Sequence, residues 1–326
     1  TIAVLEAGMG IWGLVWVTLG TALTGVLVMS LLAWRKGVWP RWNPRLISRD
    51  TLREITGFSA WAFLNQASIR IFLYTDTVII GLISGSRMVT YYTIAFMLVD
   101  YGYTLAAQVT NTFIPSLGRL AGAGDHEALR ETMLRGIRLA ALLGIPITFG
   151  IFFFAQPFIG LWMGEAYAWA GALTAILISA KVMGIINGPM GAAIWSVGNI
   201  KPLAIANIVG ALLNAVASAS VLLYTDYGVH GVAVVSAITI FILNMVVVPL
   251  HGARLLEWPL WDYLAEIARR WIPPSLLFAL CALGARELFA IDNWWSFFAI
   301  TLGITAAYGL IAYPLFLRPA LKSGRW

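Results

Sequence analysis

The stretch PLAIANIVGALLNAVASASVLLY, residues 202–224, contains no Lys, Arg, His, Asp or Glu. A helix of about 20 apolar residues is long enough to cross the ~30 Å hydrocarbon core of a bilayer. Eight other stretches have a similar length and character: 11–34, 56–83, 88–117, 131–155, 167–195, 229–253, 272–290 and 294–317. This pattern predicts an all-α fold, a polytopic membrane helix bundle with about nine spanning helices.

The distribution of basic residues predicts the orientation of these spans. Seventeen of the 21 Lys and Arg lie in alternate connections and in the C-terminal tail, all on one side of the predicted membrane. Cytoplasmic loops are enriched in Lys and Arg, so we expect the first helix to enter from outside and the C-terminus to lie inside. The most basic connection, residues 35–55, is either a short interfacial helix or a plain cytoplasmic loop.

The composition excludes several classes of protein. Hydrophobic residues make up 60% of the chain and charged residues 11%, a balance typical of membrane proteins. The net charge of +6 is the surplus of the cytoplasmic loops, so it does not indicate a nucleic-acid partner. One cysteine and three histidines without ligand spacing predict neither a metal site nor a cofactor.

Four charged residues within the predicted spans are candidates for a buried, functional position: Arg70, Asp76, Asp100 and Lys181. A charge near the bilayer centre costs on the order of 3 kcal/mol, so such residues are functional candidates by default. Counting from the helix ends places Arg70, Asp100 and Lys181 near mid-depth. Asp76 lies nearer the outer surface, where we expect a structural role as a pairing or capping residue.

Helical phase groups further polar residues with these charges. Polar side chains form one stripe on the second span and another on the third, and we expect both stripes to face a cavity rather than lipid. The predicted substrate-binding residues are Arg70, Lys181, Gln66, Tyr74, Asp100, Thr104, Gln108 and Asn111. Asp100 is also the predicted ion-coupling residue. The alternative is an Arg70–Asp100 ion pair that only joins two helices.

Several motifs resemble a known family. Asp76 is followed by IIG at 79–81 and, after a turn, by Tyr91 and Tyr92; PFIGLWMGEAY follows at 157–167 and GVHGVAVVSAI at 228–238. In this order they resemble the second half of polysaccharide flippases of the O-antigen type. These flippases belong to the multidrug, oligosaccharidyl-lipid and polysaccharide exporter superfamily.

The resemblance implies a domain organisation. Members usually have two lobes around a central cavity, so the nine predicted spans would be a fragment that covers the C-terminal part of such a protein. Residues 1–55 would hold the first span and the basic inter-lobe loop. Residues 56–255 would form a six-helix second lobe, and residues 256–326 two extra C-terminal spans and the tail.

The resemblance also implies a function. Such a protein would flip an undecaprenyl-pyrophosphate-linked oligosaccharide across a bacterial or archaeal cytoplasmic membrane by alternating access. Its partners would be this lipid-linked oligosaccharide, membrane lipids and a coupling proton or sodium ion. A lipid II flippase and a cation-coupled multidrug exporter of the same superfamily remain alternatives. A membrane-embedded polysaccharide polymerase or glycosyltransferase is more remote, because no acid/base or nucleophile cluster is apparent, and we expect no enzymatic activity.

Overall fold

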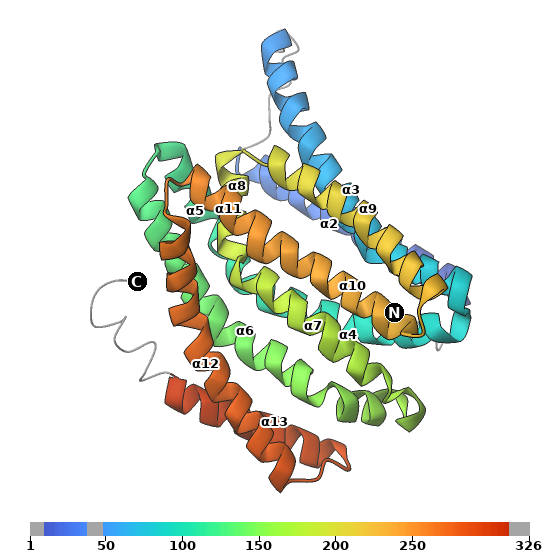
Figure 1. Ribbon diagram of the computed structural model, residues 1–326. Coiled ribbons are helices and arrows are strands. Elements are labelled where there is room, and N and C mark those ends of the chain that lie inside the picture. The colour runs from blue at the N-terminus through green and yellow to red at the C-terminus, as the bar shows by residue number, and fades with distance from the viewer. Residues whose placement is uncertain (1–9, 38–47, 313–326) are drawn as a thin grey trace. The chain divides into compact units, whose positions relative to one another are not determined.

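The computed structural model describes residues 10–37 and 48–312, and every regular element in these ranges is helical (Figure 1). Two compact units are present, Thr1–Thr56 and Gly57–Trp326. The helices are α2 (Gly10–Arg35), α3 (Arg49–Ser84), α4 (Ser86–Asn111), α5 (Ile114–Ala123), α6 (His126–Met163), η2 (Glu165–Tyr167), α7 (Ala170–Ile186), α8 (Gly188–Val197), α9 (Lys201–Tyr224), α10 (Gly228–Ile242), the π-helix η3 (Leu243–Val247), α11 (Val248–Leu255), α12 (Leu260–Leu288) and α13 (Trp294–Ala312).

The predicted all-α membrane class is confirmed, but the count of nine spans is not. Within the described ranges, six helices are long and apolar enough to cross a membrane, or seven when the bent pair α7–α8 counts as one span. The predicted spans at 88–117 and 272–290 correspond to α4 and α12, which are helical but fall outside that set. Residues 38–47 of the 35–55 connection and the basic tail after residue 312 lie outside the described residues.

Two predicted spans are interrupted by proline-initiated helices. The stretch 88–117 is split after Asn111, and α5 then begins with Pro115 in its first turn. The stretch 167–195 bends by 49° between α7 and α8, and α8 carries Pro189 in its first turn. Proline lacks a backbone N–H and fits the first turn of a helix, which suits Pro115 and Pro189 directly after these breaks. Proline alone does not force a break, because α6 continues through Pro146 and Pro157.

Short turns connect the helices of the second unit. Gly85 separates α3 from α4 with a φ of 84°, and Gly164 ends α6 with a φ of 98°, values that favour glycine over residues with a Cβ. The Asp125 carboxylate caps α6 by accepting a hydrogen bond of 3.0 Å from the Ala128 N–H. Gly85 and Gly164 therefore form tight turns at the ends of α3 and α6.

The centre of the second unit is built from α4, α6, α7 and α10, with α12 packed on α6 and α13 on α12. The α6–α7 contact is so close that a Cβ on Gly171 would lie 2.5 Å from Gln156 Cα. Side chains from α4, α6, α7, α12 and α13 share one large hydrophobic core. Such packing of small residues is typical of helix association in membranes.

Arg130 of α6 fastens the connection between α11 and α12. Its guanidinium donates hydrogen bonds to the carbonyl of Leu256 and, at 2.6 Å, to the carbonyl of Glu257. The same group lies 5.7 Å from the centroid of the Trp258 ring. These contacts satisfy carbonyl groups just past the end of α11, which have no partner within that helix.

Candidate functional site

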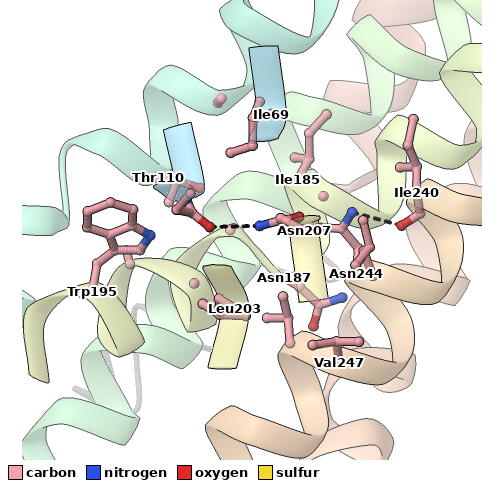
Figure 2. A pocket seen from close by; sticks show the side chains of 18 of the residues that line it. Ile69, Thr110, Ile185, Asn187, Trp195, Leu203, Asn207, Ile240, Asn244 and Val247 are labelled. Atoms are coloured by element: carbon pink, nitrogen blue, oxygen red, sulfur yellow. Dashed lines mark hydrogen bonds between the residues drawn. The ribbon is translucent and has the colours of Figure 1, made fainter. Parts of the chain in front are cut away.

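A cavity of about 530 Å³ lies inside the second unit (Figure 2). Its wall is formed by residues of α3, α4, α5, α7, α8, α9, α10, η3 and α11 and by Asn187 at the α7–α8 bend. The polar residues among them are Asn65, Gln66, Ser68, Tyr103, Thr110, Asn111, Lys181, Asn187, Trp195, Asn207 and Asn244. A cavity lined by so many amides is unusual in a bundle of apolar helices, so we take it as the candidate site.

One wall of the cavity is the inward face of α3. Asn65 is buried and its Oδ1 accepts a hydrogen bond of 2.8 Å from Nδ2 of Asn207 on α9 (Figure 2). Ser68, one turn further along α3, is also buried and donates to the carbonyl of Leu64 at 2.6 Å. Asn65 and Ser68 thus place polar groups of α3 at the cavity wall, where the Asn65–Asn207 hydrogen bond joins α3 to α9.

The opposite wall contains the bend between α7 and α8. Asn187 stands at the bend, where its Oδ1 accepts a hydrogen bond of 2.8 Å from the Tyr263 hydroxyl on α12, and its Nδ2 donates to the Met183 carbonyl at 3.2 Å. Nδ2 also lies 3.5 Å from Sδ of Met245 in the π-helix η3. Asn187 therefore links the two irregular segments of the wall, and both broken helices and π-helices are common at functional sites.

Thr110 of α4 presents an unpaired hydroxyl at this bend. The residue is 7% exposed, and its Oγ1 has no hydrogen-bond partner among the described residues. Thr110 packs so closely on Gly188 that a Cβ there would lie 2.9 Å from Oγ1. A buried polar atom without a partner costs free energy, so Thr110 is an unsatisfied polar group at the bend.

Lys181 is the cation of the cavity wall. Its Nζ lies 4.8 Å from the centroid of the Tyr103 ring, an arrangement in which the aromatic face attracts the ammonium. The ion pairs of the described residues do not include Lys181, and the cavity lining contains no Asp or Glu. The ammonium therefore stands beside the cavity with an aromatic neighbour and without a carboxylate within ion-pair distance.

The structure separates the predicted site residues into two groups. Gln66, Asn111 and Lys181 line the cavity. Five other predicted residues do not line the cavity. One of them, Asp100, is half-buried, and the other four are exposed: Arg70, Tyr74, Thr104 and Gln108. Within the described ranges, no ion pair joins Arg70 to Asp100, which removes the alternative of an Arg70–Asp100 tie. Substrate contact by any of these residues stays a prediction.

Asp76 is more deeply buried than the sequence indicated. It is 2% exposed and lies on the inward face of α3, in helical phase with Asn65. Its carboxylate accepts hydrogen bonds from the Tyr92 hydroxyl at 2.8 Å, from Asn214 Nδ2 at 2.9 Å and from Ser218 Oγ at 3.0 Å.

A fourth donor to Asp76 is the hydroxyl of Ser236. The four donors come from α4, α9 and α10, so the carboxylate joins four helices, α3 included. The sequence predicts a pairing or capping role for Asp76 near the outer surface, whereas the structure shows a buried carboxylate with four hydrogen-bond donors. The partners could have been suspected because Asn207, Asn214 and Ser218 share one face of the predicted sixth span.

The chain is similar to known membrane proteins. The polysaccharide biosynthesis protein family matches residues 1–172, more than half of the chain. The uncharacterized membrane protein EpsK of Bacillus subtilis is 23% identical over 309 residues, which cover 92% of this chain and 60% of EpsK. The probable low-salt glycan biosynthesis flippase Agl15 of Haloferax volcanii is 22% identical over 80% of this chain and 53% of Agl15.

A solved structure shares the fold. The lipid II flippase MurJ in its inward closed conformation superposes with a TM-score of 0.58 at 15% identity, over 77% of this chain and 53% of MurJ. The chain thus spans about half the length of the proteins it matches. The likeness to MurJ confirms the exporter fold, and the family match confirms the resemblance read from the motifs. The chain belongs to the polysaccharide biosynthesis protein family, within the superfamily of multidrug, oligosaccharidyl-lipid and polysaccharide exporters.

Proposed function

We propose that this chain forms the second lobe of a flippase that moves a lipid-linked oligosaccharide from the inner to the outer leaflet of the cytoplasmic membrane. The expected carrier lipid is undecaprenyl pyrophosphate. The observation that carries the proposal is the amide-lined cavity of about 530 Å³ inside an apolar membrane bundle. The family and the flippase name of the archaeal relative support it.

The physical problem of flipping is the polarity of the sugar. A hydroxyl that loses its water hydrogen bonds in hydrocarbon costs several kcal/mol, roughly 4–8 on the water-to-cyclohexane scale. Amide side chains both donate and accept hydrogen bonds, so a wall that contains Asn65, Gln66 and Asn207 can replace water around a sugar. The prenyl chain can remain in lipid throughout.

Alternating access is the mechanism we propose for this transport. In it, two lobes rock around a site near the midplane, and the bend at Asn187 and the π-helix η3 are local irregularities that can absorb such motion. The orientation with the C-terminus inside rests on the Lys and Arg distribution.

Coupling to an ion is better supported at Asp76 than at Asp100. Asp76 is buried and accepts hydrogen bonds from three other helices, whereas Asp100 is half-buried and accepts no hydrogen bond from a described residue. Loss or gain of a proton or a sodium ion at Asp76 would change the bonds that join these helices. We therefore propose Asp76 as the coupling residue.

The test is reconstitution of the full-length protein in vesicles that carry a labelled undecaprenyl-pyrophosphate oligosaccharide in both leaflets. We expect an externally added, impermeant sugar-oxidising reagent to reach the label of the inner leaflet faster than in protein-free vesicles. The glycan recovered afterwards should have its original mass, because a polymerase or glycosyltransferase would lengthen it. An inner-leaflet label that remains as protected as in empty vesicles would overturn the proposal.

A further inference from the structure

Arginines gather where α6 and α12 pack against each other. They are Arg135 and Arg138 of α6 and Arg269 and Arg270 of α12, and the two helices lie side by side in the second unit (Figure 1). Like-charge repulsion acts between Arg135 and Arg138 within α6 and between Arg138 and Arg270 across the helix contact. The guanidinium groups of both helices therefore form one set, which we call the arginine cluster.

The arginine cluster lies at the edge of the apolar part of both helices. Residues 139–163 of α6 and 271–285 of α12 contain no charged residue, so Arg138 and Arg270 are the last charges before each apolar run. The phosphates of a bilayer lie at this boundary between hydrocarbon and water. The Lys and Arg distribution indicates that the boundary is the cytoplasmic one.

Two glutamates compensate only part of the charge of the arginine cluster. Glu131 pairs with Arg135 at 2.8 Å, while Glu266 pairs with Arg270 and, at 3.4 Å, with Arg269. Four arginines and two glutamates leave a net charge of +2 on this set of residues. An anion at this place would reduce the repulsion between the guanidinium groups.

Hydrogen-bond donors in the arginine cluster also outnumber the acceptors. A guanidinium carries five N–H groups and no acceptor. The Nε–H groups of Arg135 and Arg270 are buried and have no hydrogen-bond partner among the described residues. The two side chains are 37% and 16% exposed, so a ligand outside the helix pair can reach part of each. Phosphate oxygens are the acceptors that guanidinium groups bind best, often two at a time.

Retention of arginine on the cytoplasmic side does not by itself explain the arginine cluster. That rule concerns loops and helix ends, and it accounts for an exposed residue such as Arg119 of α5. It gives no reason for guanidinium groups that are half-buried between two helices and repel one another. Basic pockets between membrane helices on the cytoplasmic side are instead typical of binding sites for lipid headgroups.

The exposed face of α12 continues from the arginine cluster into the apolar run. Ile272, Leu276, Leu280 and Leu283 are exposed and follow Arg269, itself exposed, at helical spacing on one face. A phospholipid whose phosphate lies at the cluster can place an acyl chain along this face. A soluble phosphate has no use for such a surface, which favours a lipid as the source of the anion.

We infer that the arginine cluster binds the headgroup of an anionic phospholipid, with its phosphate at the guanidinium groups and an acyl chain along the exposed apolar face of α12. The arginines of the cluster do not line the cavity. The inference therefore goes beyond the proposed function, because this lipid stays in its leaflet and joins α6 to α12 rather than being transported.

Binding of single lipids to the purified full-length protein in a neutral detergent tests the inference. Native mass spectrometry counts the bound molecules of phosphatidylglycerol and of phosphatidylcholine with identical acyl chains. We expect the wild type to bind phosphatidylglycerol at lower concentration than phosphatidylcholine. Arg270→Met should weaken the binding of phosphatidylglycerol about tenfold, since charge-assisted hydrogen bonds are lost, and should change that of phosphatidylcholine little.

Two further variants complete the test. Arg135→Met should also reduce the preference for phosphatidylglycerol, and its more exposed side chain makes it the second variant if Arg270→Met does not fold. Arg119→Met is the matched control, because it removes one exposed arginine of α5 outside the arginine cluster and should leave the preference unchanged.

Three results would overturn the inference. They are equal binding of the two lipids by the wild type, a preference that survives both Arg135→Met and Arg270→Met, and displacement of phosphatidylglycerol by inorganic phosphate, which would assign the arginine cluster to a soluble anion. Flipping in vesicles together with any of these results would remove the lipid site and keep the flippase. Arginine-dependent lipid binding without flipping would keep the site and remove the proposed transport.

Discussion

Replacement of Asp76 by alanine tests the central polar network of the second unit. The carboxylate is 2% exposed and accepts hydrogen bonds from Tyr92, Asn214, Ser218 and Ser236. Alanine would remove all four acceptor contacts at once and leave the donors inside the bundle. The loss in the free energy of unfolding therefore depends on how many of these donors find no other acceptor.

The geometry separates these donors into two classes. Ser218 can turn its hydroxyl to the carbonyl one turn earlier in its own helix, and Ser236 already lies 3.1 Å from Asn214 Oδ1. The Asn214 amide and the Tyr92 hydroxyl have no comparable substitute. Each buried group without a partner costs about 1–3 kcal/mol, so we expect Asp76→Ala to lower the free energy of unfolding by about 2–6 kcal/mol.

Asparagine at position 76 should be much milder. Oδ1 of Asp76 accepts from Asn214 and Ser218, while Oδ2 accepts from the two hydroxyls of Tyr92 and Ser236. If the new amide nitrogen takes the place of Oδ2, both hydroxyls can rotate and accept from it, because a hydroxyl is donor and acceptor. The charge and the acceptor for the Tyr92 hydroxyl proton are then lost, and we expect a cost of about 1–3 kcal/mol.

Thermal unfolding of the detergent-solubilised full-length protein measures this difference, with Tyr92→Phe as a third variant that removes a single donor. The expected order of melting temperature is wild type, then Tyr92→Phe and Asp76→Asn close together, then Asp76→Ala well below them. An Asp76→Ala protein as stable as wild type, or an Asp76→Asn protein as unstable as Asp76→Ala, would refute the reasoning. Under the proposed coupling role, Asp76→Asn should fold yet fail to flip substrate in response to an ion gradient.

Two further predictions concern packing and the bend. Gly171→Ala should destabilise the protein by about 1–3 kcal/mol, because the new Cβ would lie 2.5 Å from Gln156 Cα. The control is Gly150→Ala, whose Cβ would have no atom within 4 Å and which should leave the melting temperature unchanged or slightly raised. Equal melting temperatures of the two variants would contradict the close α6–α7 contact. Tyr263→Phe should remove the hydrogen bond to Asn187 Oδ1 and lower the free energy of unfolding by about 1–3 kcal/mol, because a buried acceptor loses its donor. An unchanged melting temperature would show that this bond does not stabilise the α7–α8 bend.

The long apolar runs were the part of the fold that the sequence predicted well. The expected span 202–224 is α9, Lys201–Tyr224, and the span at 56–83 falls within α3, which ends at Ser84. The breaks after Asn111 and at Asn187 lie inside the predicted spans 88–117 and 167–195. A span is predicted from the mean hydropathy of a long window, and the short segments QVTNT at 108–112 and NGP at 187–189 change that mean little. The local signals were Pro115 and Pro189, which lack the N–H needed in a helix interior but fit a first turn.

The candidate site was predicted less completely, and the reason is helical phase. Sequence alone shows which residues share a face of α3 but not which face is turned inward. The sequence favours the stripe with Gln66 and Arg70 as the face turned to the cavity, because it carries the cation Arg70. In the structure the buried face of α3 is the adjacent one, which carries Asn65 and Asp76. The partners of Asp76 on α9 and α10 are 138 to 160 residues away in sequence. The polar face of the sixth predicted span indicates that this helix has polar partners, but no local pattern pairs it with Asp76.

The attachment of α3 connects the cavity to the Asp76 network. Asn65 bonds to Asn207 and Asp76 bonds to Ser218, an interval of 11 residues on both α3 and α9, so the two helices run parallel and in register. Along the backbone α3 approaches its neighbours less closely than α4, α6 and α7 approach one another. These polar side chains therefore contribute to its attachment, together with Ile80, which is buried in the hydrophobic core. Since Asn65 and Asn207 both line the cavity, a ligand that competes for their amides would loosen one attachment while Asp76 keeps the other. We therefore expect occupancy of the cavity and the state of Asp76 to influence each other through α3.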